Sequence, residues 1–110
     1  MALDESAYAL QVSRAFKRLM AKLDTIDPDV LETESTGDMV TMLAPASGQK
    51  VVVNTQRAVK QLWVAGQGQG IHFDFDAATG EWKDDKGKGK ELFAWVSSCV
   101  AAISGQTLSF

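Results

Sequence analysis

An acidic stretch without any base is the part of this sequence with the clearest chemical potential. Six acids lie in residues 24–38, at Asp24, Asp27, Asp29, Glu32, Glu34 and Asp38. The pairs 27/29 and 32/34 are two residues apart, so in an extended chain each pair projects to one side. Carboxylates without thiol or imidazole suit hard cations such as ferric iron, calcium or manganese. Nothing in the pattern encloses an ion, so such binding is expected to be weak and shared. The alternative is a solvated acidic edge that aids solubility, and the residues taken alone favour it.

A second stretch, residues 54–63 (Asn-Thr-Gln-Arg-Ala-Val-Lys-Gln-Leu-Trp), combines amides with a large aromatic side chain. It follows the apolar run 51–53, and its first part is predicted to be a polar connection. If Leu62 and Val64 face a core, the strand period of two turns Gln61 and Trp63 to the other face. An exposed Trp beside amides is typical of a protein-docking surface. The same pattern fits a Trp that only covers one side of a sheet, so both interpretations stay open.

The remaining reactive residues argue against several classes of protein. His72 is the only histidine and Cys99 the only cysteine, which excludes a Cys/His zinc cage and an internal disulfide. The lone thiol fits a reducing cytoplasm, and we predict that Cys99 is a small buried hydrophobe. His72 is predicted to face solvent beside Asp74, where a metal role is the minority interpretation. The glycine-rich residues 67–70 are predicted to form a flexible loop, not a phosphate cradle, because no Lys-Ser/Thr follows. A formal net charge of −3 argues against a nucleic-acid binder.

Two helices are predicted to position these residues, over 4–23 and 91–104. Apolar residues recur at spacings of three and four in both helices. The stripe of the first is Tyr8, Val12, Ala15, Phe16, Leu19, Met20 and Leu23, and that of the second is Leu92, Val96, Cys99, Val100 and Ile103. Pro28 prevents continuation of the first helix, and Gly105 ends the second.

Between the helices, the alternation of residues predicts five to six short strands. We place them at 30–35, 39–43, 49–53, around 62–64, 71–76 and 81–83. Consecutive strands with short turns imply an antiparallel meander, and one apolar stripe per helix puts both helices on the same face. The predicted fold is therefore α+β, a two-layer sandwich with one open sheet face. Its 110 residues suit a single domain, residues 1–110, and no apolar run is long enough to span a membrane.

Several spaced segments together resemble the frataxin family, including its bacterial iron–sulfur-assembly members. They are Asn54-Thr55-Gln56, Gln61-Leu62-Trp63-Val64, Gly70-Ile71-His72-Phe73-Asp74 and Glu81-Trp82. The likeness extends through the whole chain, since the family also has a helix before the strands and one after them. It departs at Ala58, where the family usually has a proline, so the turn is less rigidly preset. The resemblance implies the same two-layer fold.

The resemblance also implies sites and partners. Frataxins bind iron at an acidic ridge on the end of the first helix and the first strand, which corresponds here to Asp24, Asp27, Asp29, Glu32 and Glu34. In the family this ridge also contacts the cysteine desulfurase. The sheet face, here with Asn54, Gln56, Gln61 and Trp63, contacts the assembly partners, among them the scaffold protein. Lys17, Arg18, Met20, Ala21 and Lys22 stand where the ridge usually continues, so we expect a lower iron capacity than in a fully acidic member.

Three functions follow as expectations. The first is an iron-binding regulator or iron donor in iron–sulfur cluster assembly, cytoplasmic and without catalysis of its own. It would bind ferrous or ferric iron weakly at its surface, as a monomer that can oligomerise with iron. The second is a ferroxidase or iron store, which the absence of a Glu-x-x-His motif does not favour. The third is a generic acidic interaction domain or calcium binder, although no dedicated calcium loop occurs.

Overall fold

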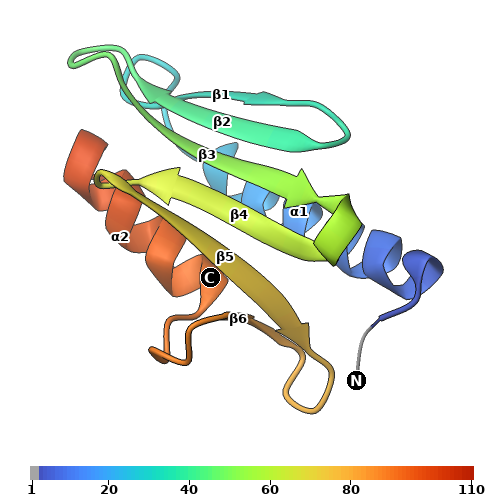
Figure 1. The fold of residues 1–110 in the computed structure, drawn as a ribbon. Helices are drawn as coiled ribbons and strands as arrows, with labels where there is room; N and C mark the ends of the chain where they lie inside the picture. The colour runs from blue at the N-terminus through green and yellow to red at the C-terminus, as the bar shows by residue number, and fades with distance from the viewer. Residues whose placement is uncertain (1–2) are drawn as a thin grey trace.

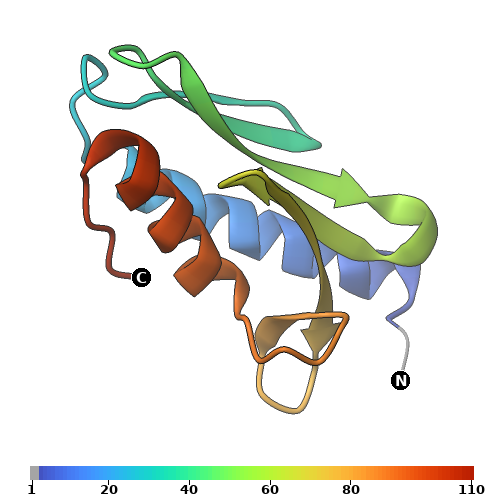
Figure 2. The ribbon, with the colours of Figure 1, turned by 60° about the vertical axis from the view of Figure 1, so that its left-hand side comes forward.

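The computed structural model describes residues 3–110 and forms a six-stranded antiparallel sheet with two helices on one face (Figure 1). In chain order the elements are α1 (Glu5–Leu23), β1 (Glu32–Ser35), β2 (Met39–Ala44), β3 (Gln49–Gln56), the 3-10 turn η1 (Arg57–Val59), β4 (Gln61–Gly66), β5 (Gln69–Asp76), β6 (Glu81–Asp84) and α2 (Leu92–Ser104). Each strand pairs with its neighbours in sequence, so β1 and β6 are the two edges. Both helices lie on the same side of the sheet in the turned view (Figure 2). The predicted two-layer α+β fold is confirmed.

The core lies between the helices and the sheet, and alternation along each strand builds it. The fully buried strand residues Val53, Leu62, Val64 and Phe73 share the helix-covered face. The predicted stripe of α1 is buried except for Met20, which is partly buried against the core. The Tyr8 hydroxyl donates a hydrogen bond to the Gln61 carbonyl oxygen (2.7 Å), which ties α1 directly to β4. No helix within residues 3–110 is long and apolar enough to cross a membrane.

Capping side chains fix where the helices begin. The Asp4 carboxylate accepts the Ala7 N–H (2.7 Å) at the start of α1. Glu91, predicted to be the first residue of the second helix, instead caps it, because its carboxylate accepts the N–H groups of Phe93 and Ala94. Gly105 ends α2 with φ 74°, as predicted. Ile103, predicted for the buried stripe, is only partly buried because it lies in the last turn of α2.

The predicted start of β1 and the predicted end of β3 are wrong. β1 begins at Glu32 and not at residue 30, because the N–H groups of Val30 and Leu31 both bond back to the Asp27 carbonyl in a turn. β3 continues to Gln56, so Asn54 and Gln56 lie in a strand paired with β4 and not in a connection. The connection is the single turn 57–59, followed by a left-handed Lys60.

The predicted flexible loop at residues 67–70 is also wrong. Gln67 (φ 51°) and Gly68 (φ 73°) are the two turn residues of a tight hairpin, whose left-handed backbone matches strand twist. Gln69 and Gly70 already belong to β5 and pair with Gly66 and Ala65. The four residues therefore form the paired end of the β4–β5 hairpin and not a separate loop.

Asp84 organises the lysine-rich loop that leads to α2. It is the only charged side chain classed as buried among residues 3–110. Its carboxylate accepts the backbone N–H groups of Lys86 (3.1 Å), Lys88 (2.8 Å) and Lys90 (2.6 Å). These bonds, the one from Lys88 most, hold the pKa of the Asp84 carboxyl below its ordinary value, although burial acts the other way.

This arrangement predicts a loss of stability in acid that depends on Asp84. The folded-state pKa lies below the unfolded value of about 3.9. The unfolded state therefore binds the proton first, and the stabilisation present above that value is lost as the pH falls through the folded pKa. We expect Asp84→Asn to flatten the decline of the free energy of unfolding between about pH 5 and 3, measured by urea titration. The lowered pKa values of Asp38 and Asp76 leave part of the slope. Lys86→Gln is the matched control, because it keeps the backbone donor, and equal slopes in wild type and Asp84→Asn would contradict the assignment.

Candidate functional site on the open sheet face

The pairing of β3 with β4 brings the four predicted partner-binding residues onto one surface. Asn54 stands directly opposite Trp63, and Gln56 directly opposite Gln61. All four are partly exposed, while the alternating residues Val53, Leu62 and Val64 are fully buried. The orientation predicted for Gln61 and Trp63 is therefore confirmed. Their binding to a partner stays a prediction.

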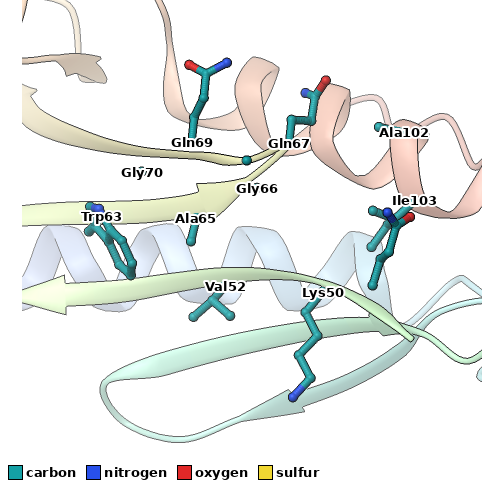
Figure 3. A pocket seen from close by; sticks show the side chains of 12 residues that line it. Lys50, Val52, Trp63, Ala65, Gly66, Gln67, Gln69, Gly70, Ala102 and Ile103 are labelled. Carbon is teal, nitrogen blue, oxygen red and sulfur yellow. The ribbon is translucent and has the colours of Figure 1, made fainter. Parts of the chain in front are cut away.

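The Trp63 side chain packs against His72 and Gly70 of β5. Its cross-strand neighbour is His72, with ring centroids 6.4 Å apart and planes tilted by 43°. The indole leans over Gly70, so that a β-carbon at Gly70 would lie 2.6 Å from Nε1 and 2.9 Å from Cζ2. Figure 3 shows the Trp63 side chain on the same side of β4 as that of Ala65, with Gly70 on the neighbouring strand. The two interpretations of Trp63 are compatible, because the ring covers Gly70 and is still partly exposed.

A hollow of about 630 Å³ continues from Trp63 toward the end of α2 (Figure 3). Its walls come from β3, β4, the β4–β5 turn and α2, and include Lys50, Gln67, Gln69 and Ile103. Within the described residues its lining holds amides, one ammonium and an indole, but no carboxylate, imidazole or thiol. These groups can donate and accept hydrogen bonds, so the hollow is suited to binding another molecule and not to acid–base catalysis or metal binding.

Contacts of Gln67 with Ser98 and Cys99 connect the β4–β5 turn to α2 at the side of this hollow. The Gln67 amide donates to Ser98 Oγ (3.0 Å) and lies 3.6 Å from Cys99 Sγ, which anchors the hairpin turn to α2. Cys99 is fully buried, as predicted. Burial raises the pKa of its thiol, so a reactive thiolate is disfavoured there.

Gln61 and His72 form the polar side of the open face. The Gln61 amide nitrogen donates to Asp74 Oδ1 (3.0 Å) and to Asp85 Oδ2 (3.3 Å). His72 lies on the predicted face, but its ring is partly buried and its Nδ1 has no hydrogen-bond partner within the described residues. His72 therefore lies on the open face, as predicted, but its ring is only partly exposed because Trp63 packs beside it. Trp82 and Trp95 are buried packing residues, as predicted.

The five acidic residues predicted to bind metal are all exposed but have different local settings. They are Asp24, which caps the C-terminal end of α1, Asp27 and Asp29 in the following turn, and Glu32 and Glu34 on β1. The Asp27 carboxylate accepts the Asp29 N–H (2.9 Å), which shapes the turn. Within residues 3–110 no three or more acid, His or Cys side chains gather into a group able to hold an ion. Metal binding at these five residues therefore stays a prediction.

Strand register shows on which face of the sheet the two glutamates of β1 lie, which the sequence did not reveal. Glu32 stands opposite Leu43 and Glu34 opposite Thr41, whereas Thr33 and Ser35 oppose the fully buried Met42 and Val40. Both glutamates therefore project to the open face, the same face as Trp63. One row of opposed residues runs from Glu34 across the sheet through Thr41, Val52 and Ala65 to Gly70. Glu32 and Glu34, the strand part of the acidic edge (residues 24–34), therefore lie on the same sheet face as Asn54, Gln56, Gln61 and Trp63.

Comparisons with known proteins agree with this geometry. Residues 1–106 match the frataxin-like domain family. The iron-sulfur cluster assembly protein CyaY of Delftia acidovorans is 38% identical over 87 residues, which cover 79% of this chain and 75% of that protein. Its namesake from Cupriavidus metallidurans is 35% identical over an alignment of 111 residues, covering 97% and 96%.

Solved structures show the same fold. Frataxin from Psychromonas ingrahamii superposes with a TM-score of 0.84 at 20% identity, over 97% of each chain. Trimeric frataxin from the yeast Saccharomyces cerevisiae gives a TM-score of 0.70 at 24% identity, covering 87% of this chain and 80% of that one.

Proposed function

This chain belongs to the frataxin-like family, and from that premise we propose that it serves iron–sulfur cluster assembly as an iron-binding regulator or iron donor. It does so by binding the cysteine desulfurase and the scaffold protein. One observation carries the proposal: a single strand register places Glu32 and Glu34 on the same open face as Asn54, Gln56, Gln61 and Trp63.

This surface has the features of a docking site for a basic partner. Trp63 is an aromatic anchor whose position is fixed by Gly70, and buried aromatic anchors carry much of the energy of interfaces. The amides of Asn54 and Gln56 offer donors and acceptors around it. The carboxylates at the edge attract a positive surface, which speeds encounter and makes the association salt-sensitive.

Iron enters this proposal as cargo on exposed carboxylates. Asp24, Asp27, Asp29, Glu32 and Glu34 supply the oxygen ligands that hard cations prefer. Because these side chains are exposed and not gathered into an enclosed group, each ion keeps most of its water and binds weakly. Such iron can be passed on easily, which suits a donor or a sensor. We propose that the protein acts through binding, not through catalysis.

The test is a ¹⁵N amide spectrum titrated anaerobically with ferrous iron, and then with the desulfurase–scaffold complex. We expect iron to broaden residues 24–34 selectively, and the complex to perturb that edge together with Gln61 and Trp63. Oxygen consumption with turnover would instead favour a ferroxidase. If neither ligand moves these residues at low salt, the acidic edge only solvates the protein.

Charge reversal gives the matched control for this test. The double variant Glu32→Lys/Glu34→Lys is expected to weaken desulfurase binding about tenfold at low salt, since each exposed pair is worth roughly 0.2–1 kcal/mol and reversal turns attraction into repulsion. Glu81→Lys also adds positive charge to an exposed strand position, but at the opposite edge of the sheet. Because Glu81→Lys changes the net charge by two units and the double variant by four, a loss of about threefold in that control would mean that net charge, and not the acidic edge, governs binding.

A further inference from the structure

The two edges of the sheet differ in how far they are closed. At β6, Lys83 forms a bridge with Glu91, and the Asp84 N–H donates to the Lys90 carbonyl (3.0 Å), so the chain itself covers that edge. β1 pairs only with β2, and Figure 1 shows it as the outermost strand. Within residues 3–110, β1 is therefore the edge left open for pairing.

The register shows which backbone groups β1 offers. The Thr36 N–H donates to the Met39 carbonyl (2.8 Å) at the start of the β1–β2 hairpin. Alternate residues of an antiparallel pair point their N–H and C=O groups inward, so Glu34 and Glu32 bond to β2. The N–H and C=O groups of Thr33 and Ser35 point outward, and no backbone partner for them is found in the described part of the chain. The outer edge of β1 therefore offers two backbone N–H donors and two C=O acceptors to an added strand.

A groove lies between α1 and the end of β1, where the β1–β2 hairpin turns. Its volume is about 300 Å³. The helix side includes the apolar Val12, Phe16 and Met20 together with Lys17, and the opposite side includes Ser35, the turn residues Thr36 and Gly37, and Arg57. The side chains of Thr33 and Ser35 lie on the helix-covered face, since they oppose buried residues of β2. A strand added to β1 would turn every second side chain toward the helix-covered side, where the groove receives the one beside Ser35, and the others toward the side of Glu32 and Glu34.

We propose that β1 accepts an extended segment of a partner protein by strand addition, and that this segment alternates apolar with basic residues. Its apolar side chains face the helix-covered side, where one enters the groove beside α1, and its Lys or Arg side chains face Glu32 and Glu34. Opposite charges across neighbouring strands attract, whereas like charges directly opposite repel. The inference rests on the proposed role of the acidic edge in docking, and it specifies how the partner's chain is held there.

A second copy of this chain is a poor occupant of the same edge. Pairing β1 with another β1 would bring Glu32 and Glu34 against the same glutamates of the other copy. Charged residues on an edge strand commonly prevent such self-pairing. The acidic character of β1 therefore excludes copies of itself while it attracts a basic strand.

The test uses a ten-residue peptide of alternating valine and lysine, with a peptide of the same composition and N-methylated alternate amides as control. Binding is followed by hydrogen exchange of the Thr33 and Ser35 amides. We expect the first peptide to slow exchange at both amides by about tenfold or more, and the N-methylated peptide to leave them unprotected. Equal binding of both peptides without protection would show charge attraction only, and absence of binding would also overturn strand addition.

Two variants sharpen the outcome. Thr33→Pro removes one outward N–H at an edge position that tolerates proline, and should weaken peptide binding about tenfold. Thr33→Val keeps that N–H and the branched shape, and should bind like wild type. Ser35→Pro replaces Thr33→Pro if the latter's amide spectrum shows unfolding. If Glu32→Lys/Glu34→Lys weakens desulfurase binding while the desulfurase leaves the Thr33 and Ser35 amides unprotected, strand addition fails and the proposed function stands.

Discussion

Trp63→Ala is expected to weaken binding to the desulfurase–scaffold complex by about 30-fold or more, which corresponds to ~2 kcal/mol. Trp63 is the largest side chain of the open face, and its indole is already fixed over Gly70 before any partner arrives. A fixed ring loses little conformational freedom on binding, so most of its buried area contributes to affinity. The measurement is the dissociation constant by isothermal titration, with the melting temperature recorded to verify folding.

Gly70→Ala tests the position of the indole without removing it. The added β-carbon would lie 2.6 Å from Nε1, so the ring must leave its seat. We expect a shifted indole N–H resonance and a loss of affinity smaller than that of Trp63→Ala. Gly37→Ala is the matched control, because a β-carbon there meets no atom within 4 Å and should change neither quantity. If Trp63→Ala binds as tightly as wild type, Trp63 only covers the sheet.

The sequence predicted what depends on local periodicity. The stripe of α1 and the alternation of Leu62 and Val64 with Gln61 and Trp63 reflect periods of 3.6 and 2, which each segment displays by itself. Burial then follows, because only one side of each element is apolar. These patterns also sufficed for the two-layer fold, since two helices with one apolar stripe each must cover the same sheet face.

What the sequence did not predict depends on contacts between segments. Strand register places Trp63 over Gly70 and puts Glu34 on the same face as Trp63. No single segment encodes that register. The extension of β3 to Gln56 has the same origin, because pairing with β4 overrides the polar composition of residues 54–56. A glycine within a strand pattern, as at Gly70, was the available signal of a close approach.

Gly66→Ala is expected to lower the free energy of unfolding by about 1–3 kcal/mol, the usual cost of overpacking a core. Gly66 ends β4 where the sheet meets α2. A β-carbon there would lie 2.6 Å from Cys99 Sγ and 3.0 Å from Cys99 Cβ, with Val51 Cγ1 at 3.6 Å on the other side. Cys99 is fully buried, so neither the thiol nor the helix can move aside freely. Urea unfolding at neutral pH measures the loss, and Gly37→Ala should stay within about 0.5 kcal/mol of wild type.

A double-mutant cycle with Cys99→Ala identifies the cause. Cys99→Ala alone removes a buried sulfur atom and should destabilise the protein by about 1 kcal/mol. In the Gly66→Ala background the same change removes the atom at 2.6 Å, so it should cost nothing or restore stability. The two effects are then non-additive by about 1–2 kcal/mol, as expected for residues in contact. Additive losses would mean that α2 does not approach β4 through Gly66. A non-additive result would also explain the placement of the hollow beside Trp63, because the close contact of Gly66 with Cys99 holds the β4–β5 turn against α2.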